Sequence, residues 1–150
     1  MIKAYEKYNC SVLGAVRADK DEDYQRYGYA GGKFVEDGVL DVRTLIEKPG
    51  KKDAPSDLAT VSGFIFTPDI FDYLNEVLEN LTEGEEFYYN DALNLMLKNK
   101  KRIIAAEIRG GKYYDTGNKL EYMKTIVELG LKHPDINGDF KKFLKNLDLE

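Results

Sequence analysis

The chain has 150 residues, of which 43% are hydrophobic and 33% charged, and its formal net charge at pH 7 is −5. This composition is typical of one soluble, globular domain that can bury a core, and it argues against a disordered chain. The longest basic run, Lys98 to Arg102, is short and is expected to be a solvated surface, so nucleic-acid binding is not predicted.

The N-terminal residues predict a short helix over Ile2 to Tyr8 and a buried strand over Ser11 to Val16. They lack the apolar core of a signal peptide, and no later apolar run is long enough to span a bilayer. The single cysteine, Cys10, cannot form an internal disulfide. We therefore expect a cytoplasmic protein with no membrane partner.

The next segments predict an irregular sheet. One or two helical turns are expected within Asp19 to Tyr27, followed by strand, diglycine turn and strand over Tyr29 to Val35. Val39 to Lys48 alternates as a strand that Pro49 ends, and residues 50 to 57 are expected to form a loop.

Strands and helices alternate through the rest of the chain. Ala59 to Phe66 predicts a buried strand, and Thr67, Pro68 and Asp69 are a strong helix start, with the hydroxyl as the N-cap. The remaining predicted elements are a helix ending near Asn80, a helix over Tyr89 to Asn99, a core strand over Ile103 to Ile108, and helices over 118 to 132 and 137 to 147. This alternation predicts an α/β fold, a sheet flanked by helices with a C-terminal helical extension.

Glu47 and Lys48 stand where a strand ends, and ligands of α/β sheets bind outside the carboxyl ends of strands. Neighbouring strand residues face opposite ways, so the two side chains can serve one ligand only if Pro49 ends the strand there. A carboxylate for sugar hydroxyls beside an ammonium for a phosphate is the minimum for binding a sugar phosphate. The alternative is an exposed Glu-Lys pair without function.

Asp115 lies in Tyr114-Asp115-Thr116-Gly117-Asn118, between a strand and a helix. Its carboxylate suits Mg²⁺, and the N–H groups of the following helix favour an anion such as phosphate. The alternative is that Asp115 or Asn118 only caps the helix; Asn118 could also cap and leave Asp115 for the metal.

Other features carry weaker signals. Gly28, just before a strand, would let a ligand approach the backbone. Within Glu86 to Leu93, capping by Asn90 or Asp91 and core packing by the aromatic residues are expected. The lone His133 and the lone cysteine exclude a zinc site of the usual His/Cys kind, and no pattern indicates a covalent nucleophile.

Taken in order, these segments resemble the second half of bacterial UTP–glucose-1-phosphate uridylyltransferases, which are sugar nucleotidyltransferases. The likeness covers nearly the whole chain, from Ile2 to Pro134. The motifs that carry it are Tyr27-Gly28, Leu45-Ile46-Glu47-Lys48-Pro49, Ala54-Pro55-Ser56-Asp57-Leu58-Ala59, Phe66-Thr67-Pro68-Asp69-Ile70-Phe71, Asn90-Asp91-Ala92-Leu93 and Tyr114-Asp115-Thr116-Gly117-Asn118-Lys119-Leu120.

The resemblance implies a partial Rossmann-like nucleotidyltransferase sheet and a reaction in which glucose 1-phosphate attacks the α-phosphorus of UTP. The products are UDP-glucose and pyrophosphate. By the same resemblance Gly28 meets the sugar with its backbone, Glu47 accepts sugar hydroxyls and Lys48 binds the sugar phosphate. Val61 to Phe64 matches a strand that lines the sugar pocket.

For the metal, the resemblance implies that Asp115 ligates Mg²⁺ and that Thr116 and Gly117 shape its turn. Lys48 and Asp115 are thus the candidate catalytic residues. Charge neutralisation by the metal and by basic groups would supply most of the rate.

Two departures from the family pattern matter. The family usually has Glu-Ile-Gln-Leu-Thr-Asp where this chain has Glu86 to Asp91, and the first half of the family, with its Gly-rich nucleotide loop and first metal-binding aspartate, is absent. We therefore expect residues 1–150 to form a single domain, the C-terminal sugar-phosphate-binding half, inactive without a nucleotide-binding half.

The alternative is a non-catalytic sugar-phosphate-binding or oligomerisation module. A half-sheet should also leave an open edge where the missing strands would pair. We therefore expect a homodimer or larger assembly, with helices 118 to 147 contributing to it.

Overall fold

The computed structural model describes residues 1–148. They form two compact units, one over Met1–Gly110 and a second that begins at Gly111. The expected single domain over residues 1–150 stays a prediction. Within residues 1–148, no helix is long and apolar enough to cross a membrane.

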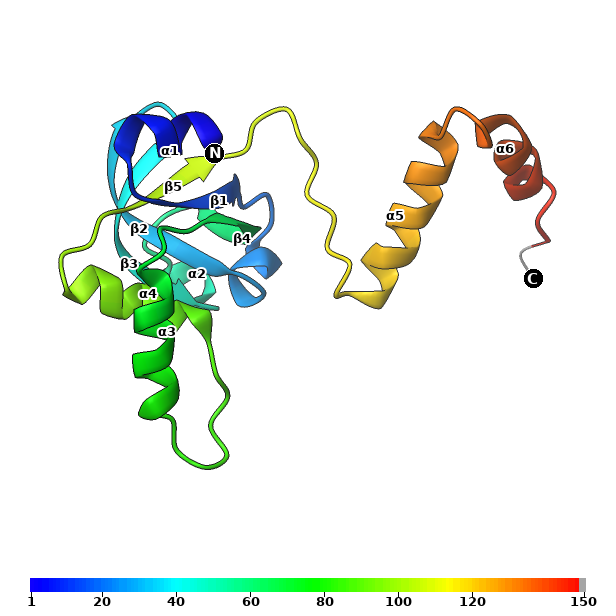
Figure 1. Ribbon diagram of the computed structural model, residues 1–150. Coiled ribbons are helices and arrows are strands. Elements are labelled where there is room, and N and C mark those ends of the chain that lie inside the picture. Colours follow the sequence, from blue (N-terminus) through cyan, green and yellow to red (C-terminus); the bar gives the residue numbers. More distant parts are fainter. Residues whose placement is uncertain (149–150) are drawn as a thin grey trace. The chain divides into compact units, whose positions relative to one another are not determined.

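The first unit contains all five strands found in residues 1–148 (Figure 1). Mixed strands and helices confirm the α/β class predicted from the sequence. Its elements in chain order are α1 (Ile2–Tyr8), β1 (Ser11–Arg17), η1 (Asp21–Gln25), β2 (Gly28–Glu36), β3 (Val39–Glu47), α2 (Gly50–Asp53), β4 (Leu58–Ile65), α3 (Ile70–Glu79), α4 (Tyr89–Lys98) and β5 (Ile103–Glu107).

The expected open edge is wrong, because the five strands close in the order β1-β4-β2-β3-β5. Only β1 and β5 are parallel, and the other pairs are antiparallel. Closure depends on two short pairings of the β2–β3 hairpin: Gly28 and Tyr29 of β2 pair with β4, and Val39 to Asp41 of β3 pair with β5. Every strand therefore has a neighbour on each side along part of its length.

Apolar side chains pack in two clusters. In the larger one, Leu13, Leu40 and Ile103 of the strands pack with Leu93 and Met96 of α4 and with α3. In the smaller one, Val12 and Ala106 pack with Ala4 of α1. Figure 1 shows α1 above the strands and the α3–α4 pair below them. Alternate residues of β1 supply the two clusters, as expected for a pleated strand whose side chains point to opposite faces.

The expected diglycine turn is wrong: Gly31 and Gly32 lie inside the continuous strand β2. The register against β3 shifts between them, which marks a β-bulge. A Cβ on Gly32 would lie 2.0 Å from the Asp41 carbonyl oxygen, so this position needs glycine. The turn falls instead at Asp37-Gly38, where Gly38 has a φ of +73° and Asp-Gly is a common two-residue hairpin turn.

Two smaller expectations also change. Residues 50–57 are not wholly loop, because α2 forms there. The Thr67 hydroxyl does not cap α3, whose N-cap residue is Asp69. It lies 3.0 Å from the Ser11 hydroxyl instead, and the Thr67 N–H donates to the same Ser11 oxygen. Ser11 is fully buried, so its hydroxyl needs these partners.

The basic run Lys98 to Arg102 is more than a solvated surface. The Lys101 ammonium lies 2.7 Å from a carboxylate oxygen of Asp69, at the start of α3. The Arg102 guanidinium donates to Asp41 of β3 over 3.1 Å and lies over the Tyr8 ring. Both charges thus form ion pairs with other elements of the fold.

Glu107, at the end of β5, joins two arginines. Its carboxylate accepts from Arg17 at 3.2 Å and from Arg109 at 2.9 Å. These arginines also pair with Asp57 and with Asp37, so the network links β1, β5, the β2–β3 turn and the segment before β4. The Glu107 side chain is only 11% exposed, and the hydrogen bonds from Arg109 and Arg17 lower its carboxyl pKa below the ordinary value.

We expect Glu107→Gln to lower the free energy of unfolding at pH 7 by about 1 to 2 kcal/mol, because one charge-assisted acceptor is lost from two arginines. Since the folded-state pKa of Glu107 is depressed, its contribution is complete above the ordinary pKa of 4.5 and is lost as the pH falls through the folded-state value. Urea titrations at pH 7 and pH 3.5 measure this.

The matched control is Asp21→Asn, which removes the exposed Lys51–Asp21 pair and should cost far less. A Glu107→Gln deficit that stayed constant down to pH 3.5 would contradict the role assigned to this carboxylate.

The second unit is a helical hairpin of α5 (Lys119–Lys132) and α6 (Asn137–Lys145), which confirms the helical extension. Asn118 caps α5, accepting from the N–H groups of Leu120 and Glu121. A Cβ on Gly130 would lie 2.7 Å from the Phe140 ring, so this glycine lets the two helices approach. Large apolar side chains of both helices are exposed, among them Leu120, Met123, Leu129 and Phe143.

Candidate functional site

Glu47 is the last residue of β3, so the strand ends where Pro49 predicted. Lys48 follows with a φ of 45°, in the left-handed region that a non-glycine residue rarely adopts. Its N–H donates to the Tyr27 carbonyl oxygen over 3.1 Å, which continues the pairing of β3 with β2 by one step. The unusual backbone conformation thus falls on a candidate ligand residue, and such conformations cluster at functional sites.

Groups from β2 and α4 lie close to the Glu47 carboxylate, and β4 supports the β2 residue. Gly28 of β2 pairs with Glu47 in the strand register. The Asn90 side-chain N–H, in the first turn of α4, donates to Glu47 Oε2 over 3.0 Å. From β4 the buried Thr60 hydroxyl donates to the Gly28 carbonyl oxygen over 3.2 Å. The structure therefore brings together Gly28 and Glu47, two of the residues predicted to contact the sugar.

Glu47 Oε2 occupies the space that a side chain at position 28 would need. An ideal Cβ on Gly28 would lie 2.8 Å from that oxygen and 3.1 Å from the Thr60 hydroxyl. The absence of a side chain at Gly28 is thus what allows the carboxylate to lie there. The approach of a sugar to the Gly28 backbone stays a prediction.

The sequence did not predict the contact of Asn90 with Glu47 or that of Thr60 with Gly28. Asn90 or Asp91 was expected to cap α4, but Tyr88 is the N-cap residue and the Asn90 amide reaches across to β3. The aromatic residues before the helix do not pack in the core either, since Phe87, Tyr88 and Tyr89 are 40% exposed or more. No short-range pattern signals a contact between residues 43 apart in the chain.

Asp115, Thr116 and Gly117 belong to the second unit. Asp115 Oδ1 accepts from the N–H of Gly117 at 3.0 Å and from the N–H of Asn118 at 3.3 Å. Since Asn118 rather than Asp115 caps α5, the carboxylate shapes a tight turn with Thr116 and Gly117 at its tip. Glu47 and Lys48 belong to the first unit.

A Mg²⁺ ion bound at this turn would have one protein carboxylate, that of Asp115, as a ligand. Residues 1–148 contain no group of three or more His, Cys, Asp or Glu side chains that could hold a metal ion. Mg²⁺ is commonly held by one or two carboxylates together with substrate phosphates and waters. Asp115 therefore fits as a single ligand to an ion held mainly by phosphates, and not as a metal site by itself.

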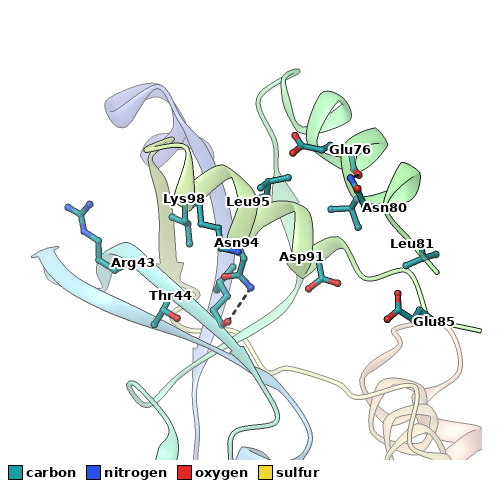
Figure 2. A pocket seen from close by; sticks show the side chains of 13 residues that line it. Arg43, Thr44, Glu76, Asn80, Leu81, Glu85, Asp91, Asn94, Leu95 and Lys98 are labelled. Carbon is teal, nitrogen blue, oxygen red and sulfur yellow. Dashed lines mark hydrogen bonds between the residues drawn. The ribbon is translucent and has the colours of Figure 1, made fainter.

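A groove of about 770 Å³ lies between β3, α3 and α4 (Figure 2). Asn94 reaches Leu45 of β3 on one side, and Asp91, Asn80 and Glu85 line the other. Gly28, Glu47 and Lys48 do not line it. The Glu47–Asn90 contact follows the Leu45–Asn94 contact along the same β3–α4 seam, so the predicted sugar site and the groove are neighbours and not one cavity.

We expect Gly28→Ala to displace Glu47 and leave the fold intact, because the new Cβ meets first the flexible end of that side chain. The affinity for glucose 1-phosphate should fall about tenfold, while the free energy of unfolding should change by less than about 1.5 kcal/mol. Calorimetric titration and urea denaturation measure the two quantities. Unchanged affinity in a folded variant would separate Gly28 from the site.

A family model described as nucleotidyl transferase matches residues 1–130. The chain belongs to this nucleotidyl transferase family. A putative UTP–glucose-1-phosphate uridylyltransferase of Methanocaldococcus jannaschii is 38% identical over 148 residues, 98% of this chain and 50% of that protein. For a UTP–glucose-1-phosphate uridylyltransferase of Staphylococcus epidermidis the identity is 36% over 149 residues, 99% of this chain and 50% of that protein.

Solved structures agree with this membership. A UDP-glucose pyrophosphorylase complexed with UDP-glucose matches 87% of this nucleotidyl transferase chain and 48% of its own, with a TM-score of 0.76 and 35% identity. A UTP-bound UGPase from Acinetobacter baumannii matches 99% of this chain and 49% of its own, with a TM-score of 0.80 and 25% identity. The chain spans about half the length of the relatives it matches, and the resemblance found in the sequence is confirmed.

Proposed function

We propose that this nucleotidyl transferase chain is the sugar-phosphate-binding, C-terminal half of a UTP–glucose-1-phosphate uridylyltransferase. The reaction would join UTP and glucose 1-phosphate to give UDP-glucose and pyrophosphate. The observation that carries the proposal is the Gly28–Glu47–Asn90 arrangement at the end of β3. It is supported by the likeness to uridylyltransferases over nearly the whole chain.

Each group of the site has a role in this proposal. The Glu47 carboxylate accepts sugar hydroxyls, because charged acceptors form the stronger hydrogen bonds. The Lys48 ammonium, directly after it in the chain, binds the phosphate of glucose 1-phosphate or UDP-glucose as a point charge. Gly28 leaves room for the carboxylate and offers its backbone to the sugar.

We propose that Asp115 is a ligand of Mg²⁺. Bound Mg²⁺ would neutralise charge on the phosphates and on the developing transition state. Asp115 would supply one oxygen ligand, with its turn held by the N–H groups of Gly117 and Asn118. Thr116 and Gly117 keep the backbone of this turn open to a substrate phosphate.

The proposed partner is a nucleotide-binding half, since the base and triphosphate of UTP need groups that this sequence lacks. We also propose self-assembly through α5 and α6, supported by the exposed Leu120, Met123 and Phe143. A concentration-independent monomer in analytical ultracentrifugation would refute it. The cytoplasm stays the predicted compartment, resting on the single cysteine, Cys10.

A chimera tests the proposed function. This chain replaces the matching half of the Methanocaldococcus jannaschii relative, and pyrophosphate release is measured with UTP, glucose 1-phosphate and Mg²⁺. The chimera should be active, Glu47→Ala and Asp115→Asn should each remove most of that activity, and the chain alone should have none.

A folded chimera without activity would contradict the uridylyltransferase proposal. If such a chain still bound glucose 1-phosphate, the result would favour the second candidate, a non-catalytic sugar-phosphate-binding or oligomerisation module.

A further inference from the structure

The amide of Asn90 is placed as a donor to a single acceptor, one oxygen of Glu47. Asn90 lies in the first turn of α4, where the N-cap residue Tyr88 makes no side-chain cap. Asparagine in a helix usually serves a cap or faces solvent. Here its Nδ2 lies 3.0 Å from Glu47 Oε2 on a different element, so the local needs of the helix do not explain it.

The helix that carries Asn90 is firmly held against the strands. Ala92, Leu93 and Met96 of α4 are almost fully buried, and they share the larger apolar cluster with Leu45 of β3. The Asn90 backbone is therefore fixed relative to β3. A donor on a packed element can orient an otherwise mobile, exposed carboxylate.

A second asparagine of α4, Asn94, also contacts β3. Asn94 lies one turn further along α4, on the same side of the helix, and its side-chain N–H donates to the Leu45 carbonyl oxygen over 3.5 Å. Leu45 and Glu47 lie two residues apart and on the same side of β3. Both asparagines thus hydrogen-bond α4 to β3, but only Asn90 contacts the candidate ligand residue Glu47.

Glu47 Oε2 also lies close to Gly28 of β2. The position of a Gly28 Cβ is 2.8 Å from this oxygen, 3.1 Å from the Thr60 hydroxyl and 3.7 Å from Asn90 Nδ2. Oε2 thus lies against the Gly28 backbone of β2 as well as the Asn90 amide of α4, while Glu47 as a whole is exposed. A carboxylate has about four acceptor sites, and the Asn90 amide uses one of them, so capacity for hydroxyl groups remains on Glu47.

We propose that Asn90 is a positioning residue for sugar recognition: it holds one oxygen of Glu47 so that the carboxylate presents its remaining acceptor sites to the hydroxyls of the hexose. This inference rests on the proposed function, because it takes Glu47 as the sugar ligand. Asn90, one of two residues that the sequence suggested as a helix cap, thereby gains a role in the site. The family pattern usually has threonine at this position.

Binding of glucose 1-phosphate to the full chain, followed by NMR, tests the effect on the sugar. Asn90→Ala should weaken binding about tenfold, and Asn90→Asp should weaken it at least as much, because it replaces the donor with a like charge beside Glu47. Asn94→Ala, the matched control on the same helix, should stay within twofold of wild type.

The side-chain amide signals of the unliganded chain test the contact itself. Glu47→Ala should shift the Asn90 NH₂ signals and leave those of Asn94 unchanged. Insensitive Asn90 signals, or wild-type affinity in the Asn90→Ala variant, would overturn the inference alone. A different result is possible: the Asn90 signals respond to Glu47→Ala, but the wild-type chain does not bind glucose 1-phosphate. That result would overturn the proposed function and, with it, the sugar role of Asn90.

Discussion

Replacing Gly32 with alanine is expected to lower the free energy of unfolding by about 3 kcal/mol or more. The new Cβ would lie 2.0 Å from the Asp41 carbonyl oxygen and 3.0 Å from the Asp41 carbonyl carbon. Both are backbone atoms of β3, so no side-chain rotation can relieve the overlap. The β-bulge would have to open, and with it the pairing of β2 with β3.

The consequence should extend beyond the hairpin. Asp41 also pairs with Ile104 of β5 and accepts from Arg102, so a displaced β3 weakens the closure of the five strands. Urea denaturation followed by circular dichroism measures the loss. The matched control is Gly63→Ala in β4, where the nearest atom to a new Cβ is the Met1 sulfur at 3.8 Å. Equal stability of the two variants would contradict the bulge.

Lys48→Gly is expected to cause a large loss of affinity for glucose 1-phosphate. Removal of the ammonium should weaken binding of glucose 1-phosphate about 100-fold, because a charge-assisted contact with phosphate contributes about 1.5 to 3 kcal/mol. The fold should not suffer. Lys48 has a φ of 45°, and glycine adopts this region without the strain of about 1 to 2 kcal/mol that other residues incur.

Stability and affinity should therefore separate in this variant. The free energy of unfolding should be unchanged or raised by up to about 1 kcal/mol, since relief of strain is offset by the larger entropy of unfolded glycine. Calorimetric titration and urea denaturation of Lys48→Gly and Lys52→Gly, a nearby exposed lysine of α2, provide the comparison. Equal affinities of the two variants would remove Lys48 from the site.

The sequence predicted the elements well where a local signal is strong. Pro49 marks the end of β3. Asn118 caps α5, which is one of the alternatives that the sequence left open. The diglycine at Gly31-Gly32 was misplaced as a turn because glycine serves both turns and bulges. The Asp37-Gly38 pair, a better hairpin signal, lies five residues later.

Features that depend on distant parts of the chain were not predictable from local pattern. Closure of the sheet is decided by the pairing of Val39 to Asp41 with β5, more than 60 residues away in the sequence. The Asn90–Glu47 hydrogen bond joins two elements that no periodicity relates. Glu47 and Lys48 could be proposed from the sequence because their place at a strand end is itself a spatial signal.

The most direct measurement of the central claim is a calorimetric titration of the full chain with glucose 1-phosphate, with and without Mg²⁺. The account predicts saturable binding that is lost in Glu47→Ala, and a Mg²⁺ enhancement that is lost in Asp115→Asn. Absence of saturable binding by the folded wild-type chain would contradict the claim that these residues form a sugar-phosphate site.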